Sequence, residues 1–213
     1  SDIKSIVEKI SFALHRNNIR SQDKVSILSS TNYRWPLCDY GIICSGAVTV
    51  TIYPTLLPDQ IVHIINDSDS KLIFVENEIQ LEKVKSVLDS CKKLKTIVVM
   101  DNSLEKEHRN VVNLNTFMIV DKSYNNDNNL NFENMISNSK PDDLLTLIYT
   151  SGTTGLPKGV MLTHQNLASN IKGVQEISTI ENNDSFLSFL PLSHVLERMA
   201  GHFSPFSAGC TIY

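Results

Sequence analysis

Short apolar segments alternate with amphipathic segments between residues 24 and 100, and this alternation restricts the fold more than any other feature of the chain. The apolar segments are rich in Val and Ile and predict strands, whereas the segments between them carry apolar residues at helical spacing. Strands are expected at 24–28, 47–52, 71–75 and 96–100, and helices at 33–44, 58–66 and 79–88. This order predicts an α/β fold with a largely parallel sheet, because each helix carries the chain back to begin the next parallel strand.

An amphipathic helix is expected ahead of the first strand. Its apolar residues recur at helical spacing, at Ile3, Ile6, Val7, Ile10 and Leu14. We expect this helix to pack on the domain, and attachment to a membrane surface is the alternative. The longest apolar run, from Tyr40 to Tyr53, is too short to cross a bilayer and predicts a buried passage from helix to strand.

Charge and cysteine content argue against several classes of function. The chain has 19 Lys and Arg against 23 Asp and Glu, a formal net charge of −4, so it lacks the basic excess typical of nucleic-acid binding. Its cysteines are scattered without a CxxC pair, which argues against a zinc site or a disulfide framework. They are Cys38, Cys44, Cys91 and Cys210. We expect free thiols in an intracellular protein of the cytoplasm or of the cytoplasmic face of a membrane.

Residues 102–140 differ from the rest of the chain in their high asparagine content, and apolar residues persist there only at 116–120 and 130–136. We interpret this segment as an insertion with an exposed loop at 121–129. The predicted organisation is therefore a first α/β portion at 1–101, an insertion at 102–140 and a second α/β portion at 141–213.

A segment rich in glycine and threonine follows the apolar residues that begin at Leu144. From Leu147 to Leu162 the sequence is L-I-Y-T-S-G-T-T-G-L-P-K-G-V-M-L, in which an apolar strand leads into a polar loop and an apolar return. Glycines let backbone N–H groups approach an anion closely, hydroxyls add donors, and a lysine adds a positive charge suited to polyphosphate. We therefore favour a phosphate-binding loop over a surface hairpin without a ligand.

This segment differs from the loop of the P-loop nucleotide hydrolases, although Lys158 follows Gly152 at the same spacing. That motif has Gly before the lysine, and after it a Ser or Thr that holds magnesium. Here Pro157 and Gly159 occupy those two positions. An ordinary P-loop hydrolase is therefore disfavoured.

Two segments resemble motifs of the adenylate-forming, or AMP-binding, superfamily, which includes acyl-CoA synthetases, firefly-type luciferases and peptide-synthetase adenylation domains. Y-T-S-G-T-T-G-L-P-K-G-V-M-L-T-H-Q-N, from Tyr149 to Asn166, resembles the phosphate loop of these enzymes. L-P-L-S-H-V-L-E-R, from Leu190 to Arg198, is similar to the next motif, in the form found in long-chain fatty acyl-CoA synthetases. The resemblance implies an N-terminal fragment of such an enzyme, the front part of its large N-terminal domain, without the small C-terminal domain.

The resemblance also implies roles for particular residues. The residues that would enclose the β- and γ-phosphates of ATP are Thr150, Ser151, Gly152, Thr153, Thr154, Gly155 and Lys158. The Thr150 hydroxyl would also help to hold Mg²⁺. His194 matches the position near the substrate carboxylate and is the candidate catalytic residue, with a structural histidine that caps the next helix as the alternative. Glu197 and Arg198 are expected to be structural, as an ion pair. Both segments follow predicted strands, the second one a strand expected at 186–190, which is consistent with one crevice at the carboxyl ends of the sheet.

The implied activity is that of a ligase of fatty acid and lipid metabolism. A long-chain fatty acid and ATP would give acyl-adenylate and pyrophosphate, and CoA would then give acyl-CoA and AMP. Alternatives are a medium-chain or aryl-CoA ligase, an adenylation domain that loads a carrier protein, and a non-catalytic nucleotide-binding module. The adenine, ribose and CoA contacts and the adenylation lysine of the superfamily are expected outside this chain, which alone should have little activity. Peripheral membrane association and oligomeric state are left open.

Overall fold

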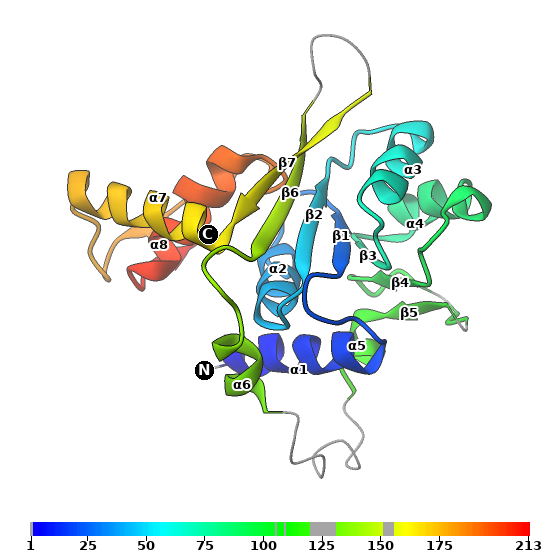
Figure 1. Cartoon of the computed structure of the whole chain (residues 1–213), viewed down its shortest axis with the longest axis horizontal. Helices are drawn as coiled ribbons and strands as arrows, with labels where there is room; N and C mark the ends of the chain where they lie inside the picture. The colour runs from blue at the N-terminus through cyan, green and yellow to red at the C-terminus, as the bar shows by residue number, and fades with distance from the viewer. Residues whose placement is uncertain (1, 105, 109, 120–130, 151–155) are drawn as a thin grey trace.

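The computed structural model describes residues 2–104, 106–108, 110–119, 131–150 and 156–213. Within these residues the main sheet has seven strands in the order β5-β4-β3-β1-β2-β6-β7 (Figure 1). The strands are β1 Lys24–Leu28, β2 Val48–Ile52, β3 Leu72–Val75, β4 Thr96–Val99, β5 Val111–Asn113, β6 Leu144–Thr150 and β7 Lys158–Thr163. Neighbouring strands from β5 to β6 are parallel, and β7 returns antiparallel to β6. The predicted α/β fold with a largely parallel sheet is confirmed.

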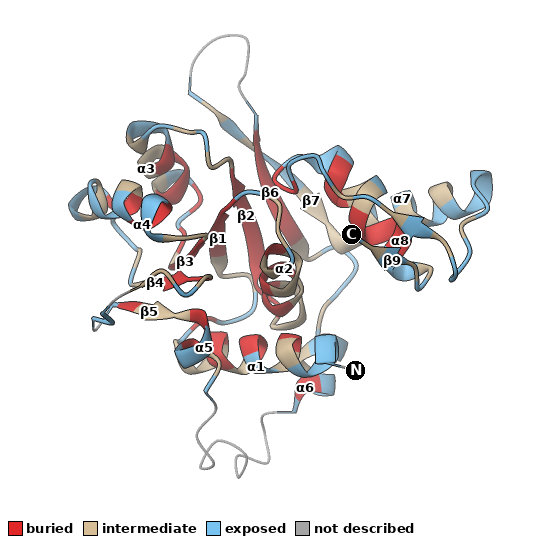
Figure 2. Cartoon of the chain, turned by 180° about the vertical axis from the view of Figure 1, so that it is seen from behind, coloured by how far each residue is buried: buried red, intermediate tan, exposed pale blue. Residues whose placement is uncertain are grey.

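Helices cover both faces of this sheet. Helices α1 (Asp2–Arg16) and α2 (Arg34–Cys44) lie on one face, and α3 (Pro58–Asp67) and α4 (Glu78–Lys85) lie on the other. The period-two alternation of each strand divides its side chains between two apolar clusters. In β3, for example, Leu72 and Phe74 pack toward α1 and α2, whereas Ile73 and Val75 pack toward α3 and α4. The central strands are therefore buried on both sides (Figure 2).

The contact between α1 and α2 depends on Gly41. A Cβ added at this glycine would lie 2.4 Å from Cγ2 of Ile10. The hydroxyl of Ser11 donates a hydrogen bond of 2.8 Å to the Gly41 carbonyl oxygen. The first helix is thus fixed to the domain through a buried face, as its spacing predicts.

The asparagine-rich segment contributes to the main sheet, which the sequence does not predict. Its residues Val111–Asn113 form β5, the edge strand beside β4. The segment also contains α5 (Leu114–Phe117) and α6 (Phe132–Ser137), and the Phe132 ring packs edge-on against Phe12 of α1 at 6.3 Å between centroids. Part of residues 102–140 therefore belongs to the main sheet. The loop expected at 121–129 lies outside the described residues.

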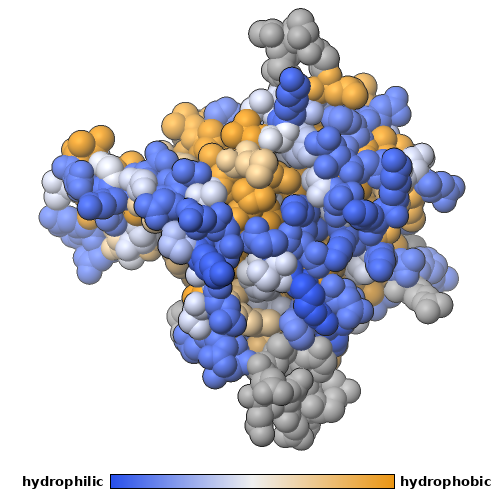
Figure 3. Space-filling view, in the orientation of Figure 1, coloured by the Kyte–Doolittle hydropathy of each residue, from blue (hydrophilic) through white to orange (hydrophobic). Residues whose placement is uncertain are grey.

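The last part of the chain extends from the sheet edge at β7. It contains α7 (His164–Ile177), the paired short strands β8 (Ser185–Phe186) and β9 (Thr211–Ile212), the π-helix η3 (Glu197–Phe203) and α8 (Ser204–Ser207). Of the strand expected at 186–190, only Phe186 is in β8. Apolar side chains gather on the surface over β7 and the neighbouring η3 (Figure 3). No described helix is both long enough and apolar enough to cross a membrane. The four cysteines are free thiols.

Candidate active site

Strands β6 and β7, on the two sides of the glycine-rich segment, pair antiparallel as the arms of a hairpin, and their ends extend past β2 (Figure 1). Thr150, at the end of β6, is the pairing partner of Lys158, at the start of β7, and both residues are exposed. The expected strand and apolar return are confirmed. The other residues expected to contact phosphate lie outside the described residues; they are Ser151, Gly152, Thr153, Thr154 and Gly155.

The second motif crosses the carboxyl ends of the neighbouring strands. Thr31, which follows β1, donates to the Leu190 carbonyl oxygen at 2.7 Å and accepts from the Leu192 backbone N–H at 3.0 Å. Thr51, near the end of β2, donates to the Ser193 carbonyl oxygen at 3.2 Å. Because β2 pairs directly with β6, these bonds bring the second motif to the carboxyl ends of the strands, where β6 leads into the glycine-rich segment. This edge is the usual ligand-binding edge of a parallel α/β sheet.

The backbone orients His194 at this edge. Its backbone N–H donates to the Pro191 carbonyl oxygen at 2.9 Å, and its Nδ1 accepts from the Leu196 N–H at 3.2 Å. A neutral imidazole with an accepting Nδ1 carries its proton on Nε2. His194 is exposed, so its Nε2–H can donate to an anion while its Nδ1 caps the start of the next helical turn. A structural role for His194 through Nδ1 and a functional role through Nε2 are therefore compatible.

Arg198 forms an ion pair with Asp39 of α2. The prediction that Arg198 pairs with Glu197 is therefore wrong. The guanidinium nitrogens Nε and Nη2 of Arg198 donate to the two oxygens of Asp39 at 2.9 and 2.6 Å, and the side chains are 3% and 1% exposed. Adjacent helical residues point in different directions and do not face each other. Glu197 instead accepts a hydrogen bond of 2.7 Å from Ser188.

Two threonines of the sheet complete this buried polar network. Nη1 of Arg198 donates to the Thr146 hydroxyl of β6 at 2.7 Å, and the Thr49 hydroxyl of β2 donates to Asp39 at 2.7 Å. In β2 the sequence V-T-V-T-I places its valines toward α3 and its threonines toward α2 and η3, which explains polar residues in a buried strand. The network joins α2, both strands and the second motif. Asp39 was missed from sequence, although an acid inside the apolar helix R-W-P-L-C-D-Y-G-I-I-C is a signal that a buried partner exists.

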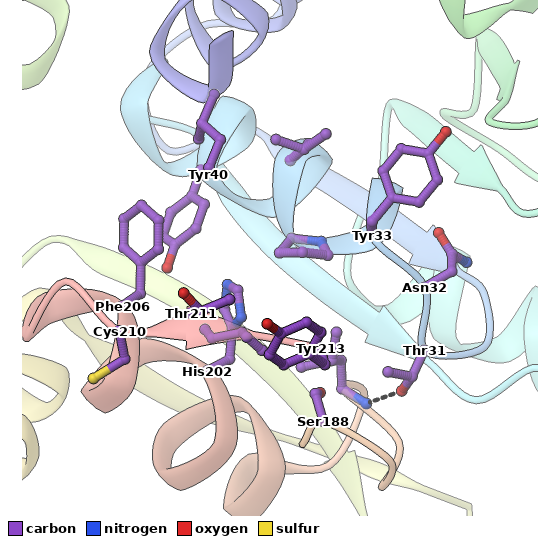
Figure 4. Close-up of a pocket in the computed structure, with 15 residues that line it drawn as sticks. Thr31, Asn32, Tyr33, Tyr40, Ser188, His202, Phe206, Cys210, Thr211 and Tyr213 are labelled. Carbon is purple, nitrogen blue, oxygen red and sulfur yellow. Dashed lines mark hydrogen bonds between the residues drawn. The ribbon is translucent and has the colours of Figure 1, made fainter. Parts of the chain in front are cut away.

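A cavity of 630 Å³ lies between α2 and the last residues of the chain (Figure 4). The Tyr40 ring packs at a tilt against Phe206, with 4.8 Å between ring centroids, and the His202 ring centroid lies 5.3 Å from that of Tyr40. Burial lowers the pKa of His202 to about 4, with the Arg198 charge acting in the same direction and Asp39 against it. No Lys or Arg is among the described residues that line this cavity, so it does not suit a triphosphate.

The described residues offer little protein ligation for a metal ion. They contain no group of three or more His, Cys, Asp or Glu side chains that could hold one. The Thr150 hydroxyl is exposed at the end of β6 and could supply one oxygen ligand to a cation that is held mainly by phosphate oxygens. These described residues thus fit Mg²⁺ as part of a metal–nucleotide complex.

Comparisons with known proteins identify the relatives of this chain. A family model described as AMP-binding enzyme matches residues 1–213. The Xenopus laevis protein ACSBG2, named a long-chain-fatty-acid–CoA ligase, is 34% identical over 179 residues, which cover 82% of this chain and 24% of that protein. Fatty acyl-CoA synthetase B of Dictyostelium discoideum is 32% identical over 197 residues, which cover 90% of this chain and 28% of that protein. The chain therefore spans 24% and 28% of the lengths of these two relatives.

The fold also matches solved structures. The inhibitor-bound N-terminal domain of FACL13 from Mycobacterium tuberculosis superposes with a TM-score of 0.79. The match covers 99% of this chain and 48% of that chain at 23% sequence identity, and it concerns the fold alone.

Proposed function

This chain belongs to the AMP-binding enzyme family, and on that premise we propose that the protein containing it activates a long-chain fatty acid with ATP. The acid and ATP give acyl-adenylate and pyrophosphate, and the thiol of CoA then displaces AMP to give acyl-CoA. The substrate class in this proposal is the long-chain fatty acid. It is supported by the two relatives named for long-chain or fatty acyl substrates and by the form of the second motif, L-P-L-S-H-V-L-E-R.

The observation that carries the proposal is the meeting of the two motifs at one edge of the sheet. The hairpin ends Thr150 and Lys158 and the exposed His194 all lie at or beside the carboxyl ends of β2 and β6. Activation of a carboxylate needs phosphate held on one side and a donor near the carboxylate on the other, because catalysis here is mainly positioning and charge stabilisation. A strand pairing that separated the motifs would not permit this arrangement.

In the proposal, the glycine-rich segment binds the β- and γ-phosphates. Lys158 supplies a positive charge, and the hydroxyls and backbone N–H groups from Thr150 to Gly155 supply donors. Mg²⁺, when bound with the nucleotide, neutralises charge on the pyrophosphate that leaves, and Thr150 adds an oxygen ligand to it.

His194 acts at the other side of this site in the proposal. Its Nε2–H donates to the substrate carboxylate or to an α-phosphate oxygen, where negative charge develops. Its Nδ1 is held by the Leu196 N–H, which fixes the tautomer that this role requires.

We also propose that residues 1–213 are the front part of a larger N-terminal domain. The fractions of the relatives that this chain covers support this division. The contacts to adenine, ribose and CoA are then made by residues outside the chain.

ATP–pyrophosphate exchange that depends on an added acid tests the proposal. We would assay the longest natural form of the protein and residues 1–213 side by side, with palmitate-like, medium-chain and aryl acids and with amino acids. Exchange with long-chain acids in the longer form supports the proposal. Preference for a medium-chain or aryl acid, or for an amino acid with transfer to a carrier protein, would replace the substrate class. Absence of exchange with every acid would favour a non-catalytic nucleotide-binding module.

A further inference from the structure

Helix α3 contacts both flanks of the phosphate-loop hairpin. His63 and Asp67 lie four residues apart on α3 and therefore share one face of the helix. The ring of His63 hydrogen-bonds through Nε2 to the Pro157 carbonyl oxygen at 2.9 Å, and the Tyr149 hydroxyl donates to Oδ2 of Asp67 at 2.6 Å. A carbonyl oxygen can only accept, so Nε2 of His63 carries a proton. One helical face thus holds the chain on each side of the glycine-rich segment.

The contacted residues are immediate neighbours of the expected phosphate-binding residues. Tyr149 precedes Thr150, and Pro157 precedes Lys158. The Tyr149 ring also packs on the returning strand, because a Cβ at Gly159 would lie only 3.1 Å from its Cζ. His63 meets the same ring edge-to-face, with 6.5 Å between centroids. A displacement of His63 is therefore transmitted to both strands of the hairpin.

The hydrogen bonds from Tyr149 to Asp67 and from His63 to Pro157 both persist at neutral pH. Burial, together with the hydrogen bond to Asp67, raises the pKa of Tyr149, so the phenol stays protonated and donates. The Nε2–H of His63 is present in the imidazolium and in one neutral tautomer, so protonation of the ring does not break the bond to Pro157.

Few other described residues pack against β7, the outer strand of the hairpin. Strand β7 is the edge of the sheet, and its residues are exposed or half-buried, whereas β6 is mostly buried. The position of Lys158 therefore depends strongly on what holds the residue before it. An error of about 1 Å in a group that positions a substrate can cost catalysis far more than the lost contact alone.

We propose that His63 is a positioning residue for the phosphate loop, which it serves by holding the Pro157 carbonyl so that Lys158 is placed to bind the β- and γ-phosphates of ATP. This inference rests on the proposed function. It assigns a role on the nucleotide side of the reaction to a histidine that lies outside both sequence motifs.

The test compares three variants of the protein in its longest natural form. His63→Ala removes the donor, His63→Gln keeps an N–H donor near the position of Nε2, and Gln60→Ala is the matched control. Gln60 is an exposed residue of α3, and its described side-chain hydrogen bond, from the Leu57 N–H at 3.1 Å, lies at the start of the helix. The readouts are the KM for ATP, the KM for the acid, kcat, and the Kd for ATP without acid.

For His63→Ala we expect the KM and Kd for ATP to rise about three- to tenfold, the factor that corresponds to one lost hydrogen bond, with the KM for the acid unchanged. His63→Gln should recover most of this loss, and Gln60→Ala should leave both ATP constants unchanged. A rise in both KM values together, no rise in either, or an equal effect of Gln60→Ala would overturn the inference, because each would indicate a general effect on the fold or none.

The ATP titration separates this inference from the proposed function. If the wild-type protein binds ATP but exchanges pyrophosphate with no acid, the proposed reaction fails while the Kd comparison still decides the role of His63. If the wild-type protein does not bind ATP at all, both are refuted.

Discussion

Breaking the buried ion pair between Asp39 and Arg198 should destabilise the protein much more when one partner is removed than when both are. The pair joins α2 to the second motif, with oxygen–nitrogen distances of 2.6 and 2.9 Å, and both side chains are almost fully buried. Asp39→Leu leaves a buried guanidinium without its counterion, and Arg198→Met leaves a buried carboxylate. The double variant Asp39→Leu/Arg198→Met replaces both charges by apolar groups.

The magnitudes follow from burial. Each single variant should lose about 3–5 kcal/mol of unfolding free energy, because an unpaired charge stays in the protein interior. The double variant should lose only about 1–3 kcal/mol, which is the cost of leaving the Thr49 hydroxyl without its acceptor. The effects of the two single changes should therefore exceed the effect of the double change by roughly 3 kcal/mol or more.

Urea unfolding followed by circular dichroism measures these differences as shifts of the midpoint at constant slope. The exposed pair Lys93 and Asp69, at 2.8 Å with side chains 55% and 57% exposed, is the matched control and should contribute little to stability, because solvent screens its charges. Additive single effects, or losses as small as those of the exposed pair, would refute the reasoning that burial makes this interaction dominant.

Three further predictions concern the site and its surroundings. Lys158→Ala should weaken ATP binding about 10- to 100-fold, since a charged contact to phosphate is lost, and an unaltered calorimetric titration would contradict it. His194→Ala should slow adenylate formation by roughly 10²–10³, and an unchanged rate of pyrophosphate release would remove His194 from the site. Burial lowers the pKa of His202 to about 4, below its value in the unfolded chain. The free energy of unfolding that depends on a neutral His202 is therefore fully present above about pH 6.5 and is lost as the pH falls toward 4. His202→Phe should make the urea midpoint less sensitive to pH over this range, and identical pH profiles would show that His202 does not titrate as its burial implies.

The fold could be predicted largely because the strands have a strong local pattern. In β1 and β2 the apolar and β-branched residues decide the structure without help from distant contacts, and the predicted strands begin and end within a residue of those observed. The edge strand β5 was missed because Val111 and Val112 stand alone in a polar segment. Their strand conformation comes from pairing with β4, a tertiary effect that local sequence does not encode.

The site was predictable where its chemistry lies in contiguous residues and not where it depends on packing. Thr150 and Lys158 lie in one continuous motif, and pairing of β6 with β7 brings them together as expected. Asp39 and Arg198 are 159 positions apart, and His63 and Pro157 are 94 apart. No spacing rule connects such residues, because their contact depends on where α2 and α3 pack on the sheet.

The strand order also determines when each part of the sheet can form during synthesis. Strands β1 to β4 pair among themselves and with β5, whereas β2 must wait for β6, with Thr49 pairing to Thr146. At synthesis rates of about 5–20 residues per second, the β2 edge stays open for roughly 5–20 seconds after the ribosome completes it. This edge, V-T-V-T-I, is apolar and β-branched, and such edges pair readily with other chains. We expect the nascent chain to depend on chaperone protection in this interval, until the strand that leads into the phosphate loop closes the edge.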